Sequence, residues 1–266
     1  MKRTLALMGL TLTLCALACA QENTGDRVVV PARNSTHPRV VNASLTNGSI
    51  TVKTYNGRDV IVEVGNSGST SRRQPDRSLD GMHRVDMPIR GLSVEEEDNV
   101  IHIRTNSPEV GNLVITVPPD TSLQLRSTHG SVNADGIRGE IEAHSTNGAI
   151  HLTNISGTVV ADTTNGSVTV SMDRVDPGKP LAFSTTNGSL DVTLPSDVKA
   201  NLRLRSFRGE IWSDFDMKLT GGQPTTTADG GKFRVEYDRT IYATVNGGGT
   251  EISLRSMNGR IMVRKK

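Results

Sequence analysis

One hexapeptide recurs along the chain as STNGAI (145–150), TTNGSV (163–168) and TTNGSL (185–190), with related copies at 45–50, 127–132, 206–211 and 256–261. Weaker half-repeats at 138–141 and 156–159 place five glycines nine residues apart, from Gly130 to Gly166. From Gly130 to Gly209 the strong copies follow at intervals of 18, 18, 22 and 21 residues. Regular self-similarity of this kind indicates a repeat architecture.

The Asn-Gly pair in these copies predicts a sharp turn, because both residue types tolerate a positive φ. An array of two-residue hairpins is one interpretation of such turns. The flanking segments match the next repeat better than they match each other, which favours stacked coils. His129 takes the Asn position in its copy, so we expect it to be a turn residue with a left-handed backbone.

The positions on both sides of each turn alternate between apolar and polar, and this period of two indicates strands with one inward face. The inward columns are Ala43, Leu125, Ala143, Ala161, Phe183, Leu204 and Leu254 before the turn, and Ile50, Val132, Ile150, Val168, Leu190, Ile211 and Ile261 after it. A Ser/Thr column two residues before the Asn can stack hydroxyls at the bend. Matching columns predict an all-β, single-domain β-solenoid or β-helix, in which successive repeats form successive coils.

The composition excludes several classes of protein. The 266 residues carry 30 Lys and Arg against 28 Asp and Glu, and this near balance argues against a nucleic-acid binder. Aromatic residues make up only 3%, which suits a narrow interior filled by aliphatic side chains. Both cysteines lie in the first twenty residues, so the body of the chain has no thiol for a zinc site, a disulfide or catalysis. We expect no cofactor.

The N-terminus has the pattern of a targeting segment. Lys2 and Arg3 precede an apolar run at 5–17, and Ala18-Cys19-Ala20 is a small-residue cleavage signal. We expect a signal peptide at 1–20, a polar lead at 21–38 and the solenoid at 39–266. Acylation of Cys19, as in bacterial lipoproteins, is the alternative to cleavage before Gln21. No later segment is apolar enough to span a membrane. The mature protein is therefore expected to be periplasmic, on the cell surface or extracellular, and lipid-anchored if Cys19 is modified.

Several landmarks together carry a family resemblance. They are the early coil at 45–50, the strand LVITVPP (113–119), the step VTLP (192–195) and the closing segment ISLRSMNGRI (252–261). With them the chain resembles the DUF4097 family of adhesin-like exported bacterial proteins, which is similar to the auto-transporter-adhesin head GIN domains. The resemblance implies a β-solenoid at the cell envelope or surface, and it supplies no site residues.

The columns of equivalent residues in the repeats allow two kinds of site to be assessed, a calcium site and an acid–base catalytic site. A calcium-binding β-roll needs carboxylates in its turns, whereas the residues after the glycines are Ser131, Ala149, Ser167 and Ser189. The outward column three residues before the Asn reads Arg126, His144, Asp162, Ser184, Arg205 and Arg255. Its first three members could perform acid–base chemistry, but a ladder of polar groups that holds the register is the interpretation we favour.

Glycosidase chemistry needs two carboxylates across a cleft. Asp135, Glu140 and Glu142 are close in sequence, but nothing places two of them across a groove. Trp212 is the aromatic residue on the predicted outer face, with Phe215 nearby, and the two are candidates for contact with a sugar ring or a partner. Alternatively, the irregular insertion at 214–231 folds back over Trp212. A second irregular segment lies at 65–81.

These observations favour an exported, non-catalytic scaffold that acts as an adhesin-like interaction surface at the cell envelope. Its partner would be an envelope component, a glycan or a protein. A carbohydrate-active β-helix enzyme is the alternative of another class, and the resemblance also allows a regulatory role in envelope stress. The sequence identifies neither a ligand nor an oligomeric state.

Overall fold

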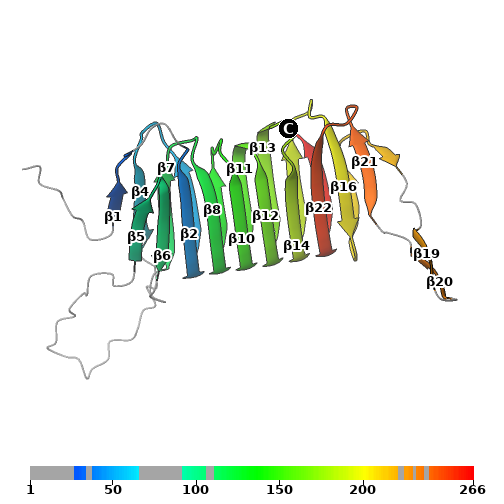
Figure 1. The fold of residues 1–266 in the computed structure, drawn as a ribbon, viewed down its shortest axis with the longest axis horizontal. Coiled ribbons are helices and arrows are strands. Elements are labelled where there is room, and N and C mark those ends of the chain that lie inside the picture. The colour runs from blue at the N-terminus through cyan, green and yellow to red at the C-terminus, as the bar shows by residue number, and fades with distance from the viewer. Residues whose placement is uncertain are drawn as a thin grey trace, which may run out of the picture.

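The computed structural model describes residues 27–33, 38–65, 92–105, 111–220, 225–229, 232–236 and 240–266. Every regular element in these ranges is a β-strand, numbered β1 to β23 (Figure 1). The strands form a ten-stranded sheet, an eleven-stranded sheet and a separate two-stranded sheet, β19 (Thr225–Asp229) with β20 (Lys232–Glu236). The predicted all-β solenoid is therefore confirmed.

Four central coils follow one another in chain order. In each coil one strand lies in the eleven-stranded sheet, and the strand after the turn lies in the ten-stranded sheet. The pairs are β8 (Ser122–His129) with β9 (Val132–Asp135), β10 (Ile141–Asn147) with β11 (Ile150–Gly157), β12 (Val159–Asn165) with β13 (Val168–Val175), and β14 (Leu181–Asn187) with β15 (Leu190–Leu194). Neighbouring coils pair in parallel, so that equivalent residues of successive repeats lie side by side.

The C-terminal coils do not follow chain order. Their strands are β16 (Ala200–Ser206), β17 (Ile211–Ser213), β18 (Lys218–Thr220), β21 (Ile241–Val245), β22 (Thr250–Asn258) and β23 (Ile261–Lys265). The last coil of the chain, β22 and β23, inserts between the β14–β15 coil and the β16–β17 coil. Figure 1 shows red β22 between yellow-green β14 and yellow β16.

The N-terminal end has the same kind of insertion. Its strands are β1 (Arg27–Val30), β2 (Val40–Asn47), β3 (Ile50–Thr54), β4 (Val60–Gly65), β5 (Leu92–Glu97), β6 (Val100–Thr105) and β7 (Asn112–Val117). The early coil, β2 and β3, lies between the β6–β7 coil and the β8–β9 coil. The prediction that successive repeats form successive coils is confirmed in the centre of the solenoid and is wrong at both ends.

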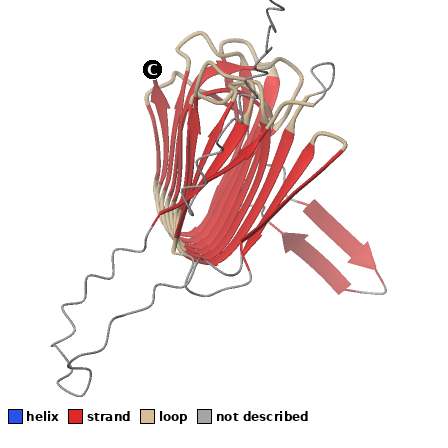
Figure 2. Cartoon of the chain, turned by 90° about the vertical axis from the view of Figure 1, so that its left-hand side faces the viewer, coloured by secondary structure: helices blue, strands red, loops and turns tan. Residues whose placement is uncertain are grey.

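The hydrophobic core lies between the two large sheets. Figure 2 shows the sheets meeting along the stacked turns and separating toward the longer loops on the opposite side. The predicted inward columns are buried, and even Ala143 and Phe183 are at most 1% exposed. Ile211 is only half-buried, because β17 is an edge strand of its sheet.

A ladder of amide side chains runs along the turn edge. Asn258 donates to Asn187, Asn187 to Asn165 and Asn165 to Asn147, each from Nδ2 to Oδ1 at 2.8 Å. Asn147 Nδ2 lies 3.2 Å from Nδ1 of His129. The repeated Asn therefore ties one coil to the next.

The Ser/Thr column lies just inside this ladder. Thr163 Oγ1 donates to the carbonyl of Gly148 at 2.8 Å, and Thr185 Oγ1 donates to Gly166 at the same distance. The equivalent bond, from a serine hydroxyl to the carbonyl of the repeat glycine in an adjacent coil, is made by Ser127, Ser145, Ser206 and Ser256. Because these hydroxyls are mostly buried, the bonds remove polar groups that would otherwise be unsatisfied.

Close packing between coils explains the repeated glycine. A Cβ built on Gly166 would lie 2.3 Å from the carbonyl oxygen of Gly148. Neither of these glycines has a left-handed φ, and the Asn residues of the repeat and His129 also lack a positive φ. The expectation of a left-handed turn at His129 is therefore wrong. Gly48 and Gly130 have φ values of 118° and 153°, but the feature that the repeat glycines share is close approach to the backbone of a neighbouring coil.

Candidate functional site

The outer face of the eleven-stranded sheet presents rows of polar side chains. One row follows the predicted ladder, with Arg126, His144, Asp162 and Ser184 as successive Cα partners on β8, β10, β12 and β14. It continues through Arg255 on β22 to Arg205 on β16, because the last coil is inserted. Each of these strands has a hydrogen-bonded neighbour on both sides, so the backbone holds the row in place.

His144 lies between two carboxylates. Its Nε2 is 2.8 Å from Oε1 of Glu142, and its Nδ1 is 3.9 Å from Oδ1 of Asp162. Ser184 donates a short hydrogen bond to the other oxygen of Asp162. The serine proton is thus directed at a carboxylate and not at the imidazole, which is not the relation of a nucleophile to its base. The geometry is that of a cross-strand polar ladder.

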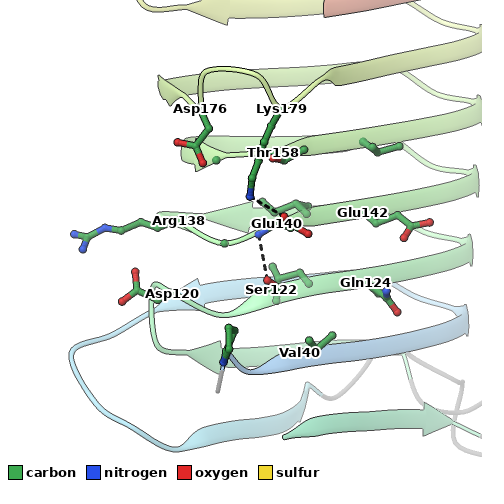
Figure 3. A pocket seen from close by; sticks show the side chains of 16 residues that line it. Val40, Asp120, Ser122, Gln124, Arg138, Glu140, Glu142, Thr158, Asp176 and Lys179 are labelled. Atoms are coloured by element: carbon green, nitrogen blue, oxygen red, sulfur yellow. Dashed lines mark hydrogen bonds and ion pairs between the residues drawn. The ribbon is translucent and has the colours of Figure 1, made fainter. Parts of the chain in front are cut away.

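A shallow groove of about 610 Å³ crosses this face near the longer loops. Leu123, Ile141 and Val160 line it, and of these Val160 is exposed whereas Leu123 and Ile141 are buried in the core. Polar side chains surround the groove (Figure 3). Figure 3 shows Lys179 reaching from its loop toward Glu140. The rim also carries Asp120, Ser122, Gln124, Arg138, Glu142 and Asp176.

An ion pair spans part of the groove. Lys179 Nζ lies 2.8 Å from Oε1 of Glu140, and this contact raises the pKa of Lys179 above its ordinary value. The structure brings Glu140 and Glu142 to one groove, which the sequence did not predict. Asp135 lies outside that groove on the other sheet, where it accepts hydrogen bonds from Thr153 and Asn154.

Lys179 and Asp176 were missed by reasoning from repeat columns, because they lie between repeats. The interval from Gly166 to Gly188 is 22 residues, against 18 for the two preceding intervals. The extra residues form the loop that carries both side chains over the groove. The longer interval was therefore the available signal.

The two predicted contact residues have different environments. Trp212 is 60% exposed on edge strand β17, and its Nε1 donates to Glu210 at 3.2 Å. It lines a small hollow of about 240 Å³ with Met262. Phe215 is only 6% exposed and packs beneath the ammonium group of Lys265. The expectation that Phe215 is a surface contact is therefore wrong, because its side chain completes the core at this end.

Other sequence predictions concern metal ions, membranes and the irregular segments. Among the residues that the structure describes, no three His, Cys, Asp or Glu side chains gather to hold a metal ion. In the same ranges no helix has the length and hydropathy to cross a bilayer. The predicted signal peptide, Cys19 and most of the segment at 65–81 lie outside the described residues.

Comparison with known proteins identifies a family. The family model described as Toastrack DUF4097 matches residues 29–264. No curated protein matches the chain significantly. Two solved structures are similar to it. One is a "putative cell adhesion protein" from Clostridium sporogenes, 8% identical over 91% of this chain and 99% of that one, with a TM-score of 0.48. The other is a "putative adhesin" from Bacteroides fragilis, 11% identical over 90% and 96%, with a TM-score of 0.39.

Proposed function

The chain belongs to the Toastrack DUF4097 family, and from this premise we propose that it is an exported, non-catalytic interaction scaffold of the cell envelope. The binding surface is the outer face of the eleven-stranded sheet. Adhesin-like attachment to an envelope component, a glycan or a protein is the activity that this surface serves.

One observation carries the proposal, namely the registered rows of polar side chains on strands that are paired on both sides. Such strands cannot shift without breaking their ladders, so the outward groups keep fixed positions over several coils. A preorganised surface loses little conformational entropy when it binds an extended ligand. The ladder through His144 gives this surface its rigidity and has no catalytic role.

A carbohydrate-active enzyme is the second candidate, and the groove is the observation that favours it. Glu140 and Glu142 both line that groove, as a pair of catalytic carboxylates would. Against this, one oxygen of Glu140 is occupied by Lys179 at 2.8 Å, and one oxygen of Glu142 by His144 at the same distance. Both carboxylates therefore have partners within the protein.

The proposal is tested by retention of the mature chain on isolated envelope and cell-wall fractions. Val160→Arg places a bulky charge on the proposed face, at a side chain that is 38% exposed. Thr169→Arg is the matched control, because Thr169 lies on the outer side of the ten-stranded sheet. We expect retention of the wild type, weaker retention of Val160→Arg and unchanged retention of Thr169→Arg. If the wild type is not retained, or if both variants bind like it, this face is not the binding surface.

A further inference from the structure

We propose that the C-terminal end of this outer face binds a linear anionic polysaccharide through Arg203, Arg205 and Arg255. The inference rests on the proposed scaffold function and names the class of its ligand. The three guanidinium groups lie on two adjacent strands, β16 and β22, with Tyr242 on the next strand, β21.

The register places these arginines together. Arg205 and Arg255 are direct Cα partners across parallel strands, and their backbones are therefore separated by about one strand spacing, ~4.8 Å. Arg203 lies two residues before Arg205, so its side chain is on the same face of the sheet. All three side chains are exposed.

Side-by-side arginines repel each other unless an anion lies between them. Among the residues whose side chains the structure describes, which excludes 221–239, no carboxylate lies within 4.0 Å of any of the three guanidinium groups. Other surface arginines do have such partners, for example Arg264 with Asp191 and Arg174 with Asp176. Among the residues with described side chains, the three arginines therefore form a positive cluster that has no ion-pair partner. An external carboxylate or sulfate group would relieve this repulsion, and guanidinium groups bind such anions bidentately.

Apolar groups adjoin this cluster. The Arg203 guanidinium lies over the Tyr242 ring, 5.9 Å from its centroid. Two residues after Arg205 and Arg255 lie Phe207, just past the end of β16 and 52% exposed, and Met257 on β22, 44% exposed. Of the nine large hydrophobic side chains that are exposed in the described residues, six lie after residue 206. Arginine, tyrosine, phenylalanine and methionine are the types enriched in binding surfaces.

A sugar chain fits this arrangement better than a peptide. β16 is hydrogen-bonded to β21 on one side and to β22 on the other, so a peptide could not add to it as a further strand. Recognition must therefore come from side chains alone. A linear polysaccharide with an acid group on each unit offers repeated anions to the arginines, and the apolar faces of its rings can pack on Tyr242.

The test uses the mature full-length chain and three probes, which are polygalacturonate, neutral dextran and poly-glutamate. Arg205→Gln/Arg255→Gln removes the paired charges. Arg27→Gln/Arg174→Gln removes two other surface charges and is the matched control. We expect the wild type to bind polygalacturonate, with an affinity that falls as the salt concentration rises. Arg205→Gln/Arg255→Gln should lose about tenfold or more in affinity, and the control variant should bind nearly as tightly as the wild type. Arg205→Lys/Arg255→Lys should fall between them, since lysine keeps the charge but not the fork.

The outcomes separate this inference from the scaffold proposal. The assignment is overturned if the wild type does not bind polygalacturonate, or if Arg205→Gln/Arg255→Gln binds it as tightly as the wild type. It is also overturned if the wild type binds dextran as tightly as polygalacturonate. Equal or tighter binding of poly-glutamate reassigns the cluster to an acidic protein partner and also overturns it. In each case, continued retention on envelope fractions leaves the scaffold proposal standing. Circular dichroism confirms that the variants are folded.

Discussion

Replacing Gly166 by alanine should destabilise the solenoid strongly, because the new Cβ would meet the backbone of the preceding coil. That Cβ would lie 2.3 Å from the oxygen of Gly148, 2.6 Å from its carbonyl carbon and 3.0 Å from the Ala149 nitrogen. Backbone atoms cannot rotate away as a side chain can, so the two coils must separate. The hydrogen bond from the Gly148 nitrogen to the Asn165 carbonyl and that from Thr163 to the Gly148 carbonyl both join these two coils.

The expected loss of stability combines two effects. Overpacking costs about 1–3 kcal/mol, and each weakened hydrogen bond removes about 1 kcal/mol. A total of about 3–5 kcal/mol lowers the melting temperature by roughly 6–20 °C, at roughly 2–4 °C per kcal/mol for a chain of this size. Thermal unfolding followed by circular dichroism measures the change.

Two further variants decide the cause. Gly65→Ala is the control, because its Cβ would meet the nearest atom at an ordinary 3.4 Å, and we expect it to unfold within about 2 °C of the wild type. Gly166→Asn distinguishes two reasons for a glycine at this position, close approach of the backbone and a left-handed backbone conformation. Asparagine tolerates the left-handed conformation far better than alanine does. Close approach predicts that both substitutions at Gly166 are damaging. A Gly166→Ala protein as stable as the control, or a Gly166→Asn protein with wild-type stability, would refute the reasoning.

Three other changes test separate features. Val168→Asp buries a carboxylate at a side chain with 0% exposure, and it should cost more than about 4 kcal/mol or prevent folding, as seen by circular dichroism; a stable variant would contradict the inward column. Thr163→Val keeps the shape but removes the bond to Gly148, and chemical denaturation should show a loss of about 1–3 kcal/mol, whereas no loss would show that the hydroxyl column is dispensable. We expect neither the wild type nor His144→Ala to cleave polysaccharides. If the wild type cleaves them and the folded variant does not, the ladder is catalytic. Mass spectrometry of protein from the native envelope should find Gln21 at the N-terminus, and a diacylglyceryl group on Cys19 would establish the alternative.

The candidate site was only partly predictable from sequence. The row of Arg126, His144 and Asp162 follows from equal distances to each Asn, and the register confirms it. The groove does not follow from those distances, because Lys179 reaches it from a loop between repeats. Phe215 looked like a surface residue beside Trp212, but it is buried. Irregular segments follow no period, so their side chains cannot be placed by counting.

The strands, their inward faces and the stacking of coils could all be predicted from the order of residues. These depend on local properties, namely the alternation of apolar residues and the Ser/Thr, Asn and Gly columns that bond to a neighbouring coil. The neighbours of each coil at the two ends, in contrast, become known only from the folded chain. Arg205 meets Arg255 because the last coil inserts between β14 and β16. Since similar Ser/Thr and Gly columns occur in each of the seven coils that carry the hexapeptide, each copy is compatible with several neighbours. The choice is made by contacts between residues far apart in the chain, and a local pattern does not encode them.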